Sequence, residues 1–172
     1  SIADQQRVCR DFVAGKGFKL SFWNLDRVLR AAPKQVFIVE GELDALALVE
    51  AGISADEVLS VPNGAKDRPA EDPAEMRGYD YVREALEAGL SKNKDDRIVW
   101  CGDSDAPGRV LQADMAKMFG AAKFRFVQWP EGCKDGNDVL LKEGPEFLRE
   151  CVLDGSLPWP VAGLYRLSEL PE

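Results

Sequence analysis

Short apolar runs alternate with helical patterns along this chain, and this alternation constrains the fold more than any other feature. Residues 36–39 read Val-Phe-Ile-Val, and residues 97–101 read Arg-Ile-Val-Trp-Cys. Such runs, rich in β-branched residues, are typical of strands buried on both faces of a parallel sheet. Residues 57–61 and 123–127 are predicted to form two further strands. We therefore expect an α/β fold with a central, mostly parallel sheet of about four strands flanked by helices.

The segments between these strands carry signals for the start and the end of helices. Residues 42–51 have apolar positions at helical spacing and are followed by Gly52. Pro107 suits the first turn of a helix that ends at Gly120. Further helices are expected over residues 7–13, 25–32, 73–89, 135–142 and 145–153.

This pattern divides the chain into three parts. Residues 1–33 are interpreted as an N-terminal helical extension, and residues 34–155 as the catalytic domain. Residues 156–172 contain two prolines close to aromatic residues and are interpreted as a linker or docking segment. The chain starts without a methionine, which suggests a piece excised from a longer protein.

The charge balance limits how this chain would bind nucleic acid. Its 22 basic and 30 acidic residues give a formal net charge of −8. Free-standing nucleic-acid-binding proteins usually present a basic face, so we expect the main phosphate contacts to lie on another domain or subunit. The same balance is compatible with a metal site, because clustered carboxylates suit a hard cation.

The absence of histidine excludes several kinds of site. No zinc site with a histidine ligand and no histidine-dependent acid–base catalysis is available to this chain. The four cysteines lack Cys-x-x-Cys spacing and are interpreted as reduced, structural thiols. No apolar run is long enough to cross a bilayer, and the first residues do not resemble a signal peptide. We expect a soluble, cytoplasmic protein with no membrane partner.

Acidic residues follow two of the predicted strands. Glu40 comes after the first strand, and Asp103 and Asp105 come after the third. The carboxyl ends of parallel strands meet at one edge of a sheet, which is where ligands bind in open α/β folds. These three acids are therefore candidates for a Mg²⁺ site, with Glu40 as third ligand or as general acid or base. Alternatively, Glu40 and Asp105 cap the helices that follow them.

A third polar cluster, residues 134–138, follows the fourth predicted strand and reads Lys-Asp-Gly-Asn-Asp. Its acids would extend the metal site, and Lys134 would meet a phosphate as a point charge. The alternative is a surface turn in which Asp135 caps the next helix. The residues themselves leave both interpretations open.

Four ordered motifs resemble the Toprim domain, which bacterial-type primases, type IA and type II topoisomerases and small nucleases share. They are Val-Glu-Gly-Glu-Leu-Asp-Ala-Leu at 39–46, Ser-Val-Pro-Asn-Gly-Ala at 60–65, Asp-Ser-Asp-Ala-Pro-Gly at 103–108, and residues 134–138. The first and last look most like the primase half of phage and mitochondrial primase–helicases. The resemblance implies a Toprim, Rossmann-like fold over residues 34–155.

The resemblance also implies roles for individual acids. Glu40 matches the family's general acid or base, which is sometimes a metal ligand, and Asp103 and Asp105 match its metal-binding aspartate pair. Asp135 would be a ligand of a second metal ion. Asp44 matches a recurrent aspartate on the first helix, with a hydrogen bond within the helix turn as the alternative.

Other motif positions would contact the nucleotide or support the site. Lys134 and Arg109 would contact phosphate, although an exposed helix arginine is the alternative for Arg109. The remaining motif residues are Asn63 and Gly64, in a turn expected to bind nucleotide, and the supporting residues Gly41, Asn137 and Asp138. Bacterial primases commonly have Asp-Pro-Asp where this chain has Asp-Gly-Asn-Asp. Which of the last two side chains would face a metal therefore stays open.

The implied function is nucleotidyl transfer that depends on Mg²⁺ or Mn²⁺. The chain would be the Toprim part of a DNA primase that makes RNA primers from nucleoside triphosphates on a single-stranded DNA template. It would act in DNA replication of a phage or mobile element, with upstream primase and downstream helicase domains or subunits, and would be incomplete alone. A metal-dependent nuclease is one alternative. A non-catalytic module that binds nucleotide, nucleic acid or a partner protein is the other.

Overall fold

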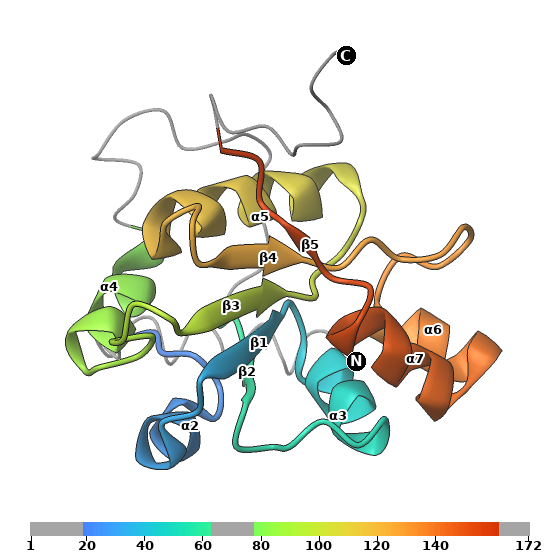
Figure 1. Ribbon diagram of the computed structural model, residues 1–172, viewed down its shortest axis with the longest axis horizontal. Helices are drawn as coiled ribbons and strands as arrows, with labels where there is room; N and C mark the ends of the chain where they lie inside the picture. Colours follow the sequence, from blue (N-terminus) through green and yellow to red (C-terminus); the bar gives the residue numbers. More distant parts are fainter. Residues whose placement is uncertain (1–18, 63–77, 162–172) are drawn as a thin grey trace, which may run out of the picture.

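A five-stranded sheet forms the centre of the computed structural model, which describes residues 19–62 and 78–161 (Figure 1). The strand order is β2-β1-β3-β4-β5. The first four strands are mutually parallel, and β5 is antiparallel to β4. The strands are β1 (Gln35–Val39), β2 (Val58–Ser60), β3 (Arg97–Trp100), β4 (Phe124–Phe126) and β5 (Leu157–Pro158).

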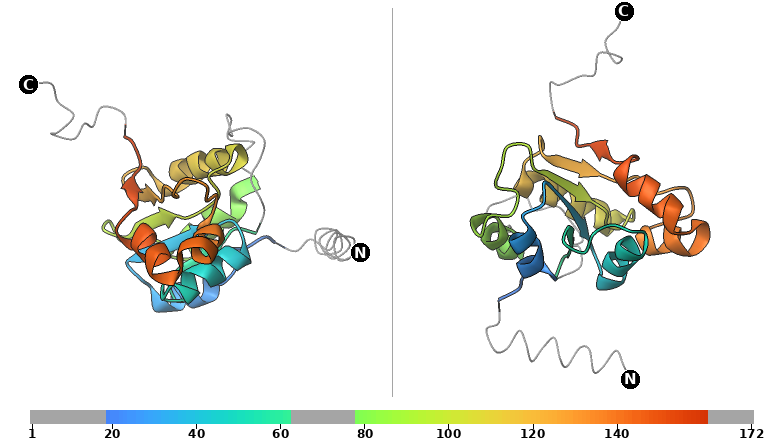
Figure 2. Two further views of the ribbon diagram at one scale, coloured as in Figure 1. Left: turned by 90° about the vertical axis from the view of Figure 1, so that its right-hand side faces the viewer. Right: turned by 60° about the horizontal axis from the view of Figure 1, so that its bottom comes forward.

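Helices cover both faces of this sheet. On one face α2, α4 and α5 pack on the sheet, and on the other α3, α6 and α7 do so. Figure 2 shows the second group gathered on one side of the molecule. The helices are α2 (Leu25–Ala31), α3 (Glu42–Glu50), α4 (Asp80–Glu87), α5 (Ala106–Phe119), α6 (Gly136–Glu143) and α7 (Pro145–Leu153).

The continuous apolar run of β1 is explained by these two layers. Val36 and Ile38 point into the core beneath α2, α4 and α5. Phe37 and Val39 point into the core beneath α3, α6 and α7. Successive side chains of a strand face opposite sides, so a strand covered on both sides needs apolar residues at every position. All four side chains are at most 2% exposed.

The predicted fold class is confirmed, with one strand more than the roughly four expected. The extra strand, β5, lies at the start of residues 156–172, the segment whose sequence predicts a linker or docking segment. It is two residues long and contains Pro158, so it shows no alternating apolar pattern. A proline is tolerated there because β5 lies at the edge of the sheet, where one side of the strand needs no hydrogen-bonded neighbour.

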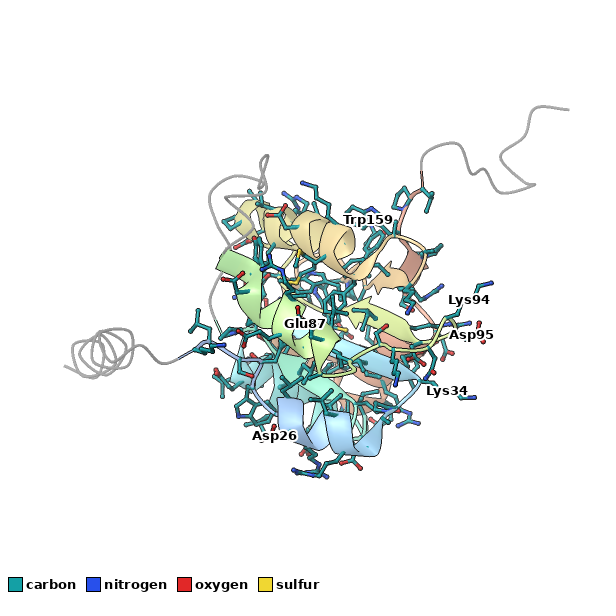
Figure 3. The ribbon with its side chains drawn as sticks, turned by 90° about the vertical axis from the view of Figure 1, so that its left-hand side faces the viewer. Asp26, Lys34, Glu87, Lys94, Asp95 and Trp159 are labelled. Carbon is teal, nitrogen blue, oxygen red and sulfur yellow. The ribbon has the colours of Figure 1, made fainter. Side chains whose placement is uncertain are left out.

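An aromatic cluster fixes the chain after β5 to the sheet. The Trp159 ring lies edge-on against Phe124 at 5.7 Å and Phe126 at 5.9 Å between ring centroids. The Trp159 backbone N–H donates a 2.9 Å hydrogen bond to the Phe124 carbonyl, and Figure 3 labels the side chain. Residues up to Trp159 are therefore packed on the sheet, while the proposed domain boundaries stay predictions.

The predicted helices occur with shifted ends. The segment 73–89 yields α4 only from Asp80, with residues 73–77 outside the described part, as residues 7–13 are. The last two helices are α6, which starts after Asp135, and α7, which matches its predicted bounds. No helix within residues 19–62 and 78–161 is long and apolar enough to cross a membrane. The cytoplasmic location stays a prediction.

Replacing Trp159 with alanine tests whether the segment after β5 belongs to the folded domain. Each aromatic pair contributes about 0.5–1.5 kcal/mol beyond its buried area. We expect Trp159→Ala to lower the free energy of unfolding in urea by about 1–3 kcal/mol. The control is Leu157→Ala, because that side chain is 36% exposed and should change stability by about 0.5 kcal/mol or less. Equal, small effects of both changes would contradict the packing described here.

Candidate functional site

The pairing of β1 with β3 brings two acidic strand ends together. Ile38 pairs with Trp100, and the Ile38 carbonyl accepts a 2.7 Å hydrogen bond from the Cys101 N–H. Two residues further along each strand, Glu40 Oε1 accepts a 3.0 Å hydrogen bond from the Asp103 N–H. Glu40 is thus committed to the neighbouring loop and does not cap α3, whose N-cap is Gly41 without a side-chain hydrogen bond.

The loop after β3 leads directly into α5. Asp105 is the N-cap of this helix, and its Oδ1 accepts a 2.8 Å hydrogen bond from the Gly108 N–H. The capping alternative is therefore realised for Asp105. A Cβ atom on Gly108 would lie 2.2 Å from the Asp103 carbonyl oxygen, so only glycine lets α5 approach Asp103 this closely. Arg109 is exposed, and its guanidinium donates to the Ser104 carbonyl.

The loop before α6 forms the second half of the site. Asp135 is the N-cap of α6 and accepts a 2.7 Å hydrogen bond from the Asp138 N–H. In return, Asp138 Oδ2 accepts a 3.1 Å hydrogen bond from the Lys134 N–H. The Lys134 carbonyl accepts a 2.8 Å hydrogen bond from the Ser104 N–H, which ties this loop to the loop after β3.

The Lys134 ammonium group lies between two of the acids. It is 2.9 Å from Asp135 Oδ2 and 3.7 Å from Asp103 Oδ2. The hydrogen bond and charge of Asp135 are the main reasons why the pKa of Lys134 is raised above its usual value. The Asp135 side chain is only 7% exposed, whereas that of Lys134 is 60% exposed. A cation from this chain therefore partly neutralises the cluster from its solvent side.

Burial and mutual repulsion raise the pKa of three acids. The pKa of Glu40 rises to about 7, first because of burial and then because of the charge on Asp103. The pKa of Asp44 rises to about 6 because of burial and then the charges on Asp135 and Asp103. Burial also raises the pKa of Asp103, although the charge on Lys134 opposes this rise. The site therefore holds more negative charge than its own lysine neutralises.

The structure brings most of the predicted site residues to this one edge of the sheet. The acids of three motifs, with Lys134, form a connected set, and the backbone of Asn137 lowers the pKa of Asp44, against the larger effect of burial. Gly41 also belongs to it, because a Cβ there would lie 3.2 Å from Asp44 Oδ2. Arg109 is bound to a loop carbonyl, and Asn63 and Gly64 lie outside the described residues.

The chemistry of these donors fits Mg²⁺ or Mn²⁺. Within residues 19–62 and 78–161, no three acidic or sulfur side chains already converge on one ion position. Mg²⁺ usually takes one or two protein carboxylates together with waters and substrate phosphates, so such a cage is not required. The position of the Lys134 ammonium group, between Asp103 and Asp135, shows that a cation is accommodated between these carboxylates. The metal roles of individual acids stay predictions.

One residue of the site, Trp129, is not predicted by the sequence motifs. Its indole Nε1–H donates a 2.9 Å hydrogen bond to the Gly102 carbonyl, directly before Asp103. The available signal was its position just after the predicted strand 123–127, at the same sheet edge as the acids. A lone aromatic residue at a strand end is usually a core residue, so the pattern gave no reason to single it out.

The structure thus has an acidic site at the carboxyl edge of an α/β sheet that helices cover on both faces, and the comparison with known families identifies the family. Residues 37–140 match the model of the Toprim-like family, which is more than half of the chain. This chain belongs to the Toprim-like family, as its motifs predict.

Named relatives and a solved structure agree with this assignment. The chain is 34% identical over 151 residues to the "Twinkle homolog protein, chloroplastic/mitochondrial" of Arabidopsis thaliana, covering 78% of this chain and 20% of that protein. It is 32% identical over 168 residues to the "Primase homolog protein" of the same plant, covering 88% of this chain and 45% of that protein. The RNA polymerase domain of Mycobacterium tuberculosis primase shares the fold, with a TM-score of 0.55 and 21% sequence identity. The match covers 82% of this chain and 43% of that structure's chain.

The chain is therefore a Toprim domain similar to those of primases. It spans about a fifth of one curated relative and less than half of the other. What those longer proteins do as a whole consequently belongs to the proposals below.

Replacing Glu40 with glutamine should change how stability depends on pH in metal-free protein. The pKa of Glu40 rises from 4.5 to about 7 on folding. As the pH increases from 4.5 to about 7, ionisation of this group therefore lowers the free energy of unfolding progressively. Glu40→Gln should raise the melting temperature by a few degrees at about pH 8 and leave it unchanged at about pH 4. Thermal unfolding followed by circular dichroism measures this. Glu42→Gln, at an exposed position on α3, is the control and should show no such gain. A gain from Glu40→Gln at both pH values would refute this account of the charge.

Gly108 and Gly136 provide a matched test of the close approach of α5 to Asp103. Both lie in the first turn of a helix that follows an aspartate N-cap. A Cβ at Gly108 meets the Asp103 backbone, whereas one at Gly136 has its nearest neighbour at 3.5 Å. We expect Gly108→Ala to destabilise the protein by about 1–3 kcal/mol in urea unfolding. Gly136→Ala should be neutral or slightly stabilising, because alanine favours helix more than glycine. Equal effects would rule out this steric argument.

Proposed function

We propose that this domain provides the metal-dependent nucleotidyl-transfer site of a DNA primase. The observation that carries the proposal is the acidic cluster at the carboxyl edge of the sheet. In it Asp103 and Asp135 flank Lys134, and Glu40 accepts a hydrogen bond from the Asp103 N–H. Burial first, and then the charge on Asp103, raise the pKa of Glu40 to about 7. A site with this surplus of negative charge is suited to a divalent cation that also carries nucleotide phosphates.

Each residue has a defined part in this proposal. Asp103 and Asp105 would hold Mg²⁺ or Mn²⁺, and Asp135 would be a ligand of a second ion. Only Oδ1 of Asp105 caps α5, so its other carboxylate oxygen would serve as the ligand. A bound ion would neutralise the charge that develops on the transferred phosphate. Lys134 binds a phosphate oxygen through its ammonium group, which already lies at the exposed side of the cluster. Glu40 holds or moves a proton, since a pKa of about 7 lets the carboxyl group exist in both forms near neutral pH.

The similarity to longer proteins supports a primase context. One relative is called a primase homologue and the other a Twinkle homologue, and more than half of each lies outside the matched part. We propose that this domain works in DNA replication within a larger primase–helicase. Upstream primase and downstream helicase domains or subunits would bind the single-stranded DNA template. The net charge of −8 supports this division, because a domain this acidic is a poor binder of DNA by itself.

Metal binding by the 172-residue chain is the first test. Titration with Mn²⁺, followed by electron paramagnetic resonance, should show binding that Asp103→Asn weakens by more than about tenfold. The control is Asp95→Asn, in the exposed loop that precedes β3 and so lies at the opposite edge of the sheet (Figure 3). This change should leave Mn²⁺ binding unaltered. Absence of Mn²⁺ binding, with or without nucleotide, would favour a non-catalytic module.

Activity assays then separate primase from nuclease. The isolated chain should make little RNA primer, whereas a longer parent protein should make primers that disappear with Asp103→Asn. Metal-dependent nicking of plasmid DNA by the isolated chain, lost in Glu40→Gln, would instead establish a nuclease. Efficient primer synthesis by the 172 residues alone would contradict the proposed need for further domains.

A further inference from the structure

We propose that Trp129 is a positioning residue that fixes the loop carrying Asp103 relative to the loop carrying Lys134 and Asp135. This role rests on the proposed function insofar as it concerns metal binding, but the contacts themselves are independent of it. Trp129 lies between β4 and α6 and is itself neither acidic nor basic. It would act only by holding the backbone of two neighbouring loops.

One end of the Trp129 ring is anchored to the loop after β3. The indole Nε1–H donates a 2.9 Å hydrogen bond to the carbonyl oxygen of Gly102, which is buried. That carbonyl belongs to the peptide bond that leads into Asp103. A buried carbonyl without a donor is costly, so this bond favours one orientation of the Asp103 peptide unit.

The other side of the ring lies against the start of α6. A Cβ on Gly136 would lie 3.5 Å from Cη2 of Trp129, so the ring is the nearest side chain beside the residue after Asp135. Trp129 is 7% exposed and packs in the core with Cys133 and Val139, on either side of Asp135. One rigid ring is therefore bonded to the loop before Asp103 and lies beside the residue that follows Asp135.

The opposite side of Gly102 is blocked by a second indole. A Cβ on Gly102 would lie 2.3–2.8 Å from ring atoms of Trp100, so this ring packs closely against the glycine, and it belongs to the other core from Trp129. Trp100 Nε1 is buried without a hydrogen-bond partner, so Trp100 supplies contact but no directed bond. Gly102 is thus held between two rings, of which Trp129 alone donates to its carbonyl.

Two further hydrogen bonds show why this position matters for the acids. The Asp103 N–H donates to Glu40, and the Ser104 N–H donates to the Lys134 carbonyl at 2.8 Å. Both bonds require that the backbone after Gly102 keeps its orientation. Groups behind metal ligands commonly change metal affinity by about 10–100-fold when removed, because they set where the ligands point. Trp129 has this relation to Asp103.

Replacing Trp129 with phenylalanine removes the N–H while keeping an aromatic ring. In metal-free protein, we expect amide hydrogen exchange at Asp103 and Ser104 to become several-fold faster, with little change elsewhere in the sheet. For Mn²⁺, we expect the dissociation constant to rise about tenfold. The matched control is Trp159→Phe, which makes the same chemical change beside Phe124 and Phe126, away from the site. It should change neither reading.

The outcomes separate this inference from the proposed function. Unchanged exchange at Asp103 and Ser104 in Trp129→Phe, or equal changes in Trp159→Phe, would overturn the positioning role. If the wild-type chain binds no Mn²⁺, the proposed function fails while the exchange result still decides the role of Trp129. If Trp129→Phe does not fold, the positioning role is tested instead by the NMR signal of the Trp129 indole proton in the wild-type chain. In an NMR titration with Mg²⁺ it should shift together with the Asp103 amide, and a Trp129 signal as constant as that of Trp159 would overturn the proposal.

Discussion

The hydrogen bond from the Asp103 N–H to the Glu40 carboxylate is the contact on which the rest of the site depends. It joins the ends of β1 and β3, which are adjacent and parallel, and it keeps two acids close despite their repulsion. This one backbone donor does not offset the burial of Glu40 and the charge on Asp103, so the pKa of Glu40 remains raised. Lys134 reduces the repulsion further, because its ammonium group lies beside Asp103 in one loop and Asp135 in the other. The fold thus fixes the positions of these acids before any ligand arrives.

The sequence predicted the parts of the fold that depend on hydrophobic periodicity. Four parallel strands and the helices between them follow from apolar runs that must be buried on both faces. The run at β1 predicted a strand buried on both faces, and in the structure each of its side chains enters one of the two cores. β5 could not be predicted, since two residues with a proline carry no period. Its place in the sheet depends on packing of Trp159 against β4, which is a tertiary effect.

The candidate site was predictable as a set of residues but not as a set of contacts. Strand ends of a parallel sheet meet, so Glu40 and Asp103 were expected to be neighbours. Side-chain choices between capping and binding depend on local geometry, which spacing does not encode. Asp105 and Asp135 both cap helices, whereas Glu40 does not. Trp129 was missed for a related reason, since its importance lies in one directed N–H bond rather than in its residue type.

The position of Lys134 means that this side chain and a metal cation would compete for the same carboxylates. In the protein alone, its ammonium group neutralises Asp103 and Asp135 from the exposed side. On the proposed function, Asp103 and Asp135 would hold divalent metal, and the Lys134 ammonium group would then no longer be needed to neutralise them. Its charge would then be available for a phosphate oxygen of the incoming nucleotide. Metal binding and nucleotide binding would thereby be coupled, because the Lys134 ammonium group would exchange its ion pairs with the protein for one with the nucleotide.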